Sequence, residues 1–144
     1  MVYLDMKKLV IVFFAFFSCA ASGESLVDSV TSAHSEQSVI GSYHYTMPPG
    51  FPFPGTNTIT LSGDGTFRYD MSLSRGKMAA FIGTWSFTNG MVIAVTNERF
   101  LEGKPYPPTD PNGWKPGNEM HLYIVGDKLY KNKNSKEPFT KTGN

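Results

Sequence analysis

The feature that most constrains the fold is a strict alternation of apolar and polar residues in the stretch TFRYDMSL, residues 66–73. Every second position in it is apolar, at Phe67, Tyr69, Met71 and Leu73. Because successive side chains of a β-strand point to opposite faces, this period of two places the apolar set on one face. The stretch therefore predicts an antiparallel strand that is buried on one face only.

Turn residues at short intervals connect further stretches of the same kind. The turns GDG at 63–65, NG at 89–90 and GD at 126–127 favour tight hairpins between neighbouring strands. The pattern predicts about seven strands, at residues 39–46, 57–62, 66–74, 78–88, 91–97, 119–125 and 128–133. Gly83 lies in the middle of one of them, where a glycine predicts a bulge or a sharp bend.

A chain of short antiparallel strands must hide its apolar face, either by closing into a barrel or by stacking as a sandwich. Since tight turns join consecutive strands and no stretch has a helical pattern, we expect an all-β fold. The sequence predicts a small antiparallel up-and-down barrel of about seven or eight strands. Trp85 shares a strand face with Phe81 and Phe87, and we expect it in the core.

Residues 1–23 have the pattern of an export signal, with a basic start, nine apolar residues at 9–17 and a run of small residues. The apolar run is much shorter than the roughly 20 residues of a membrane-spanning helix. Cys19, the only cysteine, follows it directly, where bacterial lipoproteins are cleaved and lipidated. Either Cys19 carries a lipid anchor, or ordinary cleavage near Ala21 or Gly23 releases the chain.

The rest of the chain is expected to form one domain with flexible ends. Residues 24–38 are polar and rich in serine, which predicts a flexible tether; residues 39–134 should form the barrel and 135–144 a flexible tail. From residue 24 onward, 11 lysines and arginines balance 11 acidic residues. A nucleic-acid-binding protein would show a basic stripe, so we expect no nucleic-acid partner.

No residue pattern supports catalysis or a cofactor. A G-x-S-x-G motif is missing, the predicted domain has no cysteine, and the only histidines are His34, His44 and His121. His44 and His121, together with Met47 and Met120, are ligand types that suit copper(I). Their ordinary interpretation is exposed strand histidines and core methionines. We therefore expect no enzyme and no cofactor, and these four residues are only weak candidates for a metal site.

Two proline-rich stretches, PPGFPFPG at 48–55 and KPYPPTDPNGWKPG at 104–117, interrupt the strands. Proline lacks the amide hydrogen that a central strand needs, so both should be loops. Their large aromatic residues belong to no alternating pattern: Phe51, Phe53, Tyr106 and Trp114. These four side chains either plug the mouth of the barrel or form an apolar patch that binds a ligand or partner.

Four stretches spread over residues 39–131 read IGSYHYT, NTITLSGDGTFRYD, GTWSFTNGMVIAVTN and HLYIVGDKLYK. Together they resemble the lipocalin-like domains of small bacterial envelope lipoproteins, in particular the N-terminal domain of the copper-homeostasis and envelope-stress lipoprotein family. The resemblance implies a lipocalin-like barrel and a lipid on Cys19. It also implies an outer-membrane lipoprotein that faces the periplasm, the alternative being a soluble periplasmic or secreted protein.

The chain departs from that family in its first loop, which in the family reads P-C-x-x-C-P-G. Pro49 and Pro54-Gly55 match the flanking residues, whereas Gly50 and Phe53 occupy the two cysteine positions. Neither side chain can coordinate copper, so the resemblance does not extend to a metal site in this loop.

The sequence is compatible with three functions. The first is a non-enzymatic envelope lipoprotein whose barrel binds a protein or another envelope component, in stress response or inhibition. The second is a carrier that holds a small hydrophobic ligand in the barrel. The third is copper homeostasis, which only the family resemblance implies.

Overall fold

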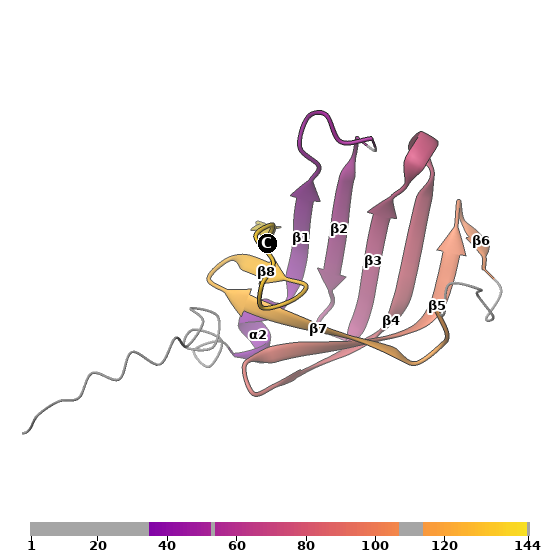
Figure 1. Cartoon of the computed structure of the whole chain (residues 1–144). Helices are drawn as coiled ribbons and strands as arrows, with labels where there is room; N and C mark the ends of the chain where they lie inside the picture. The colour runs from indigo at the N-terminus through magenta and orange to yellow at the C-terminus, as the bar shows by residue number, and fades with distance from the viewer. Residues whose placement is uncertain (1–34, 53, 107–113, 144) are drawn as a thin grey trace, which may run out of the picture.

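The structure is a computed structural model that describes residues 35–52, 54–106 and 114–143 (Figure 1). It contains a short helix, α2 (Glu36–Val39), and one 3-10 turn, η2 (Ser74–Gly76). The strands are β1 (Gly41–Thr46), β2 (Thr56–Leu61), β3 (Thr66–Ser72), β4 (Met78–Thr88), β5 (Met91–Leu101), β6 (Lys104–Pro105), β7 (Asn118–Val125), β8 (Lys128–Tyr130) and β9 (Phe139–Thr142).

Eight of these strands close into a barrel. They pair in the order β4-β3-β2-β1-β9-β8-β7-β5, and the pairing of β5 with β4 completes the ring. Every pair is antiparallel, and strands that follow one another in the chain are neighbours in the sheet. The prediction of a small antiparallel up-and-down barrel is therefore confirmed. The short strand β6 pairs with the end of β5 beside the barrel.

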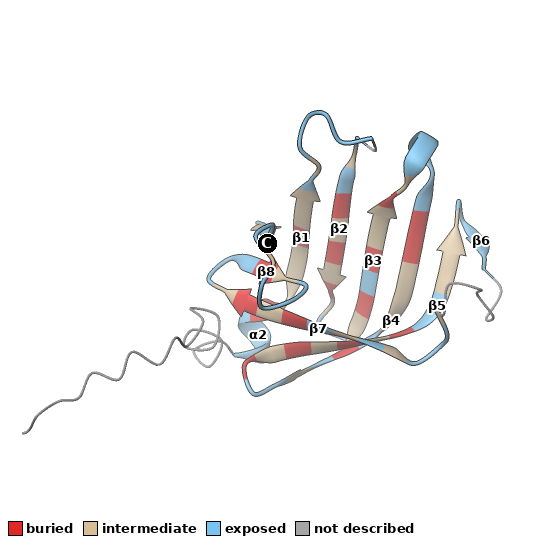
Figure 2. Ribbon diagram, in the orientation of Figure 1, coloured by how far each residue is buried: buried red, intermediate tan, exposed pale blue. Residues whose placement is uncertain are grey.

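The alternation along the strands separates the core from the surface, as Figure 2 shows by the alternating burial along β2 and β3. On β3, Phe67 and Tyr69 are buried and Arg68 between them is exposed. Trp85 is only 8% exposed, and its indole nitrogen donates a hydrogen bond to the carbonyl oxygen of Ser62 at 2.8 Å. The prediction that Trp85 lies in the core is confirmed.

Both ends of the domain extend beyond the boundaries that the sequence predicted. Residues 36–39 form α2 inside the expected tether, and residues 139–142 form β9 inside the expected flexible tail. β9 pairs with β1 on one side and β8 on the other, and Phe139 is only 2% exposed. The stretch FTKT is too short for an alternating pattern to be recognised, so its strand depends on the two edges that it joins.

Tyr43 holds α2 against the barrel. Its hydroxyl group donates a hydrogen bond of 2.7 Å to the carbonyl oxygen of Val39, which is fully buried. Burial raises the pKa of Tyr43 to about 12, so the hydroxyl stays protonated and keeps donating well into the alkaline range. Among the described residues, no helix has the length and apolar character that crossing a membrane requires.

The predicted bulge at Gly83 is confirmed. Gly83 lies opposite Thr96 and its neighbour Ile82 lies opposite Glu98, so one residue of β5 has no partner on β4. A Cβ atom on Gly83 would overlap the carbonyl oxygen of Val95, which means that only glycine allows the two strands to approach this closely.

Candidate ligand-binding site

The barrel has two different ends. At one end, which we call the mouth, lie the described parts of four connections: β1–β2 (47–52 and 54–55), β3–β4 (73–77), β5–β7 (102–106 and 114–117) and β8–β9 (131–138). At the other end, the helix end, lie α2 and the tight turns 62–65, 89–90 and 126–127. β7 pairs with β5 only along the part nearer the helix end, from Met91 to Thr96, whereas β5 continues to Leu101. β6 pairs with β5 at Phe100 and Leu101, so among the described residues the wall of the barrel is incomplete between β6 and β7 near the mouth.

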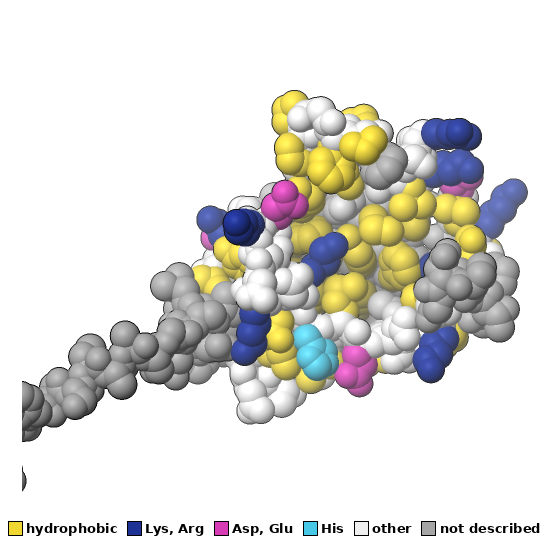
Figure 3. All heavy atoms as spheres, viewed as in Figure 1, with side chains coloured by type: hydrophobic (Ala, Val, Ile, Leu, Met, Phe, Trp, Pro, Cys, Tyr) yellow, Lys and Arg dark blue, Asp and Glu magenta, His cyan; other side chains and the backbone are white. Residues whose placement is uncertain are grey.

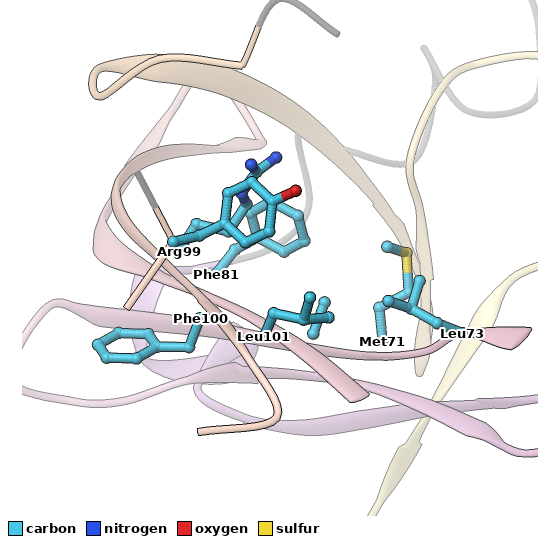
Figure 4. A pocket seen from close by; sticks show the side chains of 8 residues that line it. Met71, Leu73, Phe81, Arg99, Phe100 and Leu101 are labelled. Atoms are coloured by element: carbon cyan, nitrogen blue, oxygen red, sulfur yellow. The ribbon is translucent and has the colours of Figure 1, made fainter. Parts of the chain in front are cut away.

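Two apolar cavities occupy this incomplete side. The first has a volume of about 280 Å³ and is lined by Met71, Leu73, Ala79, Phe81, Arg99, Phe100, Leu101 and Tyr106. The second has a volume of about 220 Å³ and is lined by Tyr69, Met71, Phe81, Thr96, Trp114, Asn118, Glu119 and Met120. Met71 and Phe81 line both, so the cavities adjoin. Figure 4 shows Met71 and Leu73 on one side of the first cavity and Phe81, Arg99 and Leu101 on the other.

Aromatic rings form a continuous row across the interior. The distances between ring centroids are 5.7 Å for Tyr45 and Phe139, 6.0 Å for Phe139 and Tyr69, 6.0 Å for Tyr69 and Phe81, and 6.5 Å for Phe81 and Trp114. Such rings offer large apolar surfaces with few conformations to lose on binding. In Figure 3, hydrophobic side chains gather in the opening of the barrel in front of β2–β4.

Tyr106 and Trp114, two of the four predicted binding residues, come together around Arg99. The central guanidinium carbon lies 3.7 Å from the centroid of the Tyr106 ring and 5.0 Å from that of Trp114. These distances are those of cation–π contacts. Tyr106 and Trp114, which come from the second proline-rich stretch, thus contact the same residue of β5. Tyr106 lines the first cavity and Trp114 lines the second.

Arg99 was missed by the sequence reasoning because its orientation depends on the bulge. Alternation from Val92 through Ala94 and Thr96 would place Glu98 on the inner face. The extra residue in β5 shifts the pattern by one, so Arg99 lies opposite the inward-facing Phe81. The bulge at Gly83 was the one signal in the sequence that could have indicated this change.

Phe51, another predicted binding residue, lies apart from the cavities. It belongs to the β1–β2 connection, is 49% exposed and lines neither cavity, so it does not plug the barrel. Phe53 lies outside the described residues. Tyr106 and Trp114 contact Arg99 on β5.

Two polar pairs lie beside the aromatic row. The ammonium group of Lys131 donates a hydrogen bond of 3.2 Å to the hydroxyl oxygen of Tyr69. The hydroxyl of Tyr45 donates one of 2.8 Å to Glu137, and this hydrogen bond raises the pKa of Tyr45. Lys131 and Glu137 come from the β8–β9 connection, where no sequence pattern marked them. An apolar surface with a few polar groups at its border suits binding.

The four weak metal candidates do not form one ligand set. His44 on β1 contacts the hydroxyl of Thr58 at 3.0 Å, whereas His121 on β7 contacts Glu119 at 3.3 Å. β9 and β8 separate these strands, which corresponds to three strand spacings of about 4.8 Å each. Met120 packs against the core, as its ordinary interpretation predicts, and Met47 lies in the β1–β2 connection. Within the described ranges, no three His, Cys, Asp or Glu residues are grouped as a metal site requires.

No protein-family model, no curated protein and no solved structure matches this chain. The resemblance to lipocalin-like envelope lipoproteins therefore stays a prediction from short motifs.

Proposed function

We propose that this protein is a non-enzymatic binding protein of the bacterial cell envelope whose barrel mouth holds a small hydrophobic ligand. The observation that carries the proposal is the pair of adjoining apolar cavities on the incomplete side of the barrel. Pockets for small molecules typically measure about 300–1,000 Å³ and are lined by apolar and aromatic side chains with few polar groups. An eight-stranded barrel can enclose one small ligand of this kind.

The volumes and the polar groups narrow the class of ligand. The volume of each cavity lies below the usual range for small-molecule pockets. A slender molecule that occupies both adjoining cavities is therefore favoured over a bulky one. Tyr69 lines the second cavity, and its hydroxyl is held by Lys131. This arrangement favours a ligand with an apolar body and a single hydrogen-bonding end.

Filling the cavities tests the proposal. Met71→Trp places a large ring where both cavities meet, and we expect it to weaken binding of the neutral apolar dye N-phenyl-1-naphthylamine about tenfold or more, because the ring takes up the space of the ligand. Dye fluorescence measures the binding. The matched control is Met91→Trp at the helix end of β5, which lines neither cavity and should bind the dye like the wild type. A wild-type protein that does not bind the dye, or equal binding by both variants, would contradict the proposal.

Binding of a protein or another envelope component is the second candidate function. The observation that favours it is the exposure of Phe51 and Tyr106, since exposed large apolar side chains commonly mark interaction sites. Pull-down with the intact protein should recover a partner that Phe51→Ser loses, without a change in melting temperature. Copper homeostasis has less support, because the four candidate ligands lie on separated elements.

Attachment to the envelope membrane through Cys19 belongs to the same proposal. Cys19 lies outside the described residues, and the support is its position directly after the apolar part of the export signal. Metabolic labelling with a fatty-acid analogue should tag the wild-type protein. Cys19→Ser should abolish the tag and release the protein from membranes. An untagged, soluble wild-type protein would show instead that ordinary cleavage releases the chain.

A further inference from the structure

We infer that the mouth of the barrel docks onto the surface of a lipid bilayer that contains anionic lipids. In this arrangement Phe51 of the β1–β2 connection inserts between the lipid headgroups, and basic residues around the mouth face the phosphates. The inference goes beyond the proposed ligand site, because it concerns the outer rim of the barrel and does not require an occupied cavity.

Exposed apolar side chains gather at the mouth. Among the described residues, the large hydrophobic side chains with high exposure are Phe51 at 49%, Met78 at 42% and Tyr106 at 37%. They lie in the β1–β2 connection, at the start of β4 and directly after β6, all at the mouth. The stretch from residue 46 to 63 has no charged side chain. In Figure 3, hydrophobic side chains cover the β1–β2 connection.

Basic residues surround these apolar side chains. The connections at the mouth contain five exposed ones that can face outward: Arg75, Lys77, Lys104, Lys115 and Lys136. Lys131 and Lys133 belong to the same connections, but their ammonium groups lie against the rings of Tyr69 and Tyr123. The acidic residues in the described part of these connections are Glu102 and Glu137. The mouth therefore has an excess of positive charge, although the chain as a whole has a formal net charge of only +1.

The helix end lacks this combination of features. Its acidic residues Glu36, Asp64 and Asp127 are balanced in part by Lys128 and Lys141 on the adjoining strands. None of the three highly exposed hydrophobic side chains lies there. The field of a negatively charged surface would thus attract the mouth and not the helix end.

The combination of features fits a bilayer surface. Apolar and aromatic side chains that enter the boundary between headgroups and acyl chains, flanked by lysine and arginine, are typical of proteins that lie on anionic membranes. Proline restricts the β1–β2 connection before binding, which lowers the entropy lost when Phe51 becomes ordered. Docking would also turn the two cavities toward the lipid, so that a hydrophobic ligand could enter without crossing water.

The proposed lipid anchor is compatible with this orientation. Fifteen residues separate Cys19 from Ser35, and such a chain can reach about 50 Å when extended. The barrel strands have up to 11 residues, which corresponds to about 36 Å. A chain anchored through Cys19 is thus long enough to run past the barrel while the mouth contacts the same membrane.

Sedimentation with vesicles tests the inference, using the chain from residue 24 onward, so that neither the apolar export signal nor an acyl chain contributes. We expect the protein to sediment with an equal mixture of phosphatidylcholine and phosphatidylglycerol and to remain in solution with phosphatidylcholine alone. Each basic residue near an anionic surface contributes about a fivefold gain in affinity. Arg75→Gln/Lys77→Gln/Lys104→Gln should therefore weaken binding about 100-fold, and added salt should weaken it as well.

Single substitutions separate the apolar and the electrostatic parts. Phe51→Ser should weaken vesicle binding about tenfold, because the ring no longer enters the lipid, and should keep the melting temperature, since the ring is half exposed. Lys77→Gln should lower the affinity for the mixed vesicles about fivefold. The matched control Lys128→Gln removes the same charge at the helix end and should bind like the unsubstituted protein.

Three results would overturn the inference: no sedimentation with the mixed vesicles, equal sedimentation with both vesicle types, or equal losses from Lys77→Gln and Lys128→Gln. The ligand proposal can fail independently. Met71→Trp, which fills the cavities, is expected to leave vesicle binding unchanged. A Met71→Trp protein that no longer binds the dye but still binds vesicles would show that the cavities and the docking surface bind independently.

Discussion

Trp85→Ala is expected to prevent stable folding or to lower the melting temperature by many degrees. Trp85 is only 8% exposed, and its indole nitrogen donates a hydrogen bond to the carbonyl oxygen of Ser62. Its backbone nitrogen donates a second hydrogen bond, of 2.9 Å, to the carbonyl oxygen of Gly65. Truncation of a buried tryptophan to alanine typically costs about 3–5 kcal/mol. A domain is stabilised by only about 5–15 kcal/mol, so a large part of the stability would be lost. Thermal unfolding followed by circular dichroism measures the change.

Two further variants separate the contributions at this position. Trp85→Phe keeps an aromatic ring but removes the hydrogen bond to Ser62, and we expect it to cost less than the alanine variant. Trp114→Ala makes the same truncation at the mouth, where the side chain is only partly buried, and should cost less too. A Trp85→Ala protein that melts within a few degrees of the wild type would contradict the assignment of Trp85 to the core.

Gly83→Ala is expected to destabilise the seam between β4 and β5, which closes the barrel. The added Cβ atom would overlap the carbonyl oxygen of Val95 and would lie 2.9 Å from the Cα atom of Thr96. Both are backbone atoms, so no side-chain rotation relieves the overlap and the strands must move apart. Overpacking of this kind costs about 1–3 kcal/mol and sometimes more. Urea denaturation gives the change in the free energy of unfolding.

Gly63→Ala is the matched control for this substitution. A Cβ atom at Gly63 would make an ordinary contact of 3.5 Å with the side chain of Ile40, so we expect little loss of stability. The seam also sets the orientation of Arg99, because the bulge turns this side chain toward the cavities. If Gly83→Ala were as stable as Gly63→Ala, the close approach of β4 and β5 at the bulge would be wrong.

The cavity and the charged rim have complementary roles in the proposed function. The basic residues around the mouth add little to the affinity for a neutral apolar ligand. Both these residues and Phe51 add to the affinity for an anionic membrane surface. The same end of the barrel would hold the ligand and contact the membrane from which the ligand comes. Substitutions of the rim are therefore expected to affect capture of the ligand from vesicles more than binding of the free dye.

The sequence by itself determined the class of the fold and much of its core. Alternation at residues 66–73, the turns at 63–65, 89–90 and 126–127, and the glycine at position 83 act over a few neighbouring residues. Side-chain direction in a strand and the backbone angles of a tight turn depend on such local sequence. The barrel, the core position of Trp85 and the bulge could therefore be predicted before the structure was known.

Only the tertiary structure decided where the barrel opens and which side chains meet there. β9 is a strand because β1 and β8 each offer it an unpaired edge, and FTKT alone does not determine this. Arg99 faces the cavities because β4 and β5 shift in register at Gly83. The contact of Lys131 with Tyr69 joins residues 62 positions apart. Such contacts depend on the packing of distant strands, and no local pattern in the sequence records that packing.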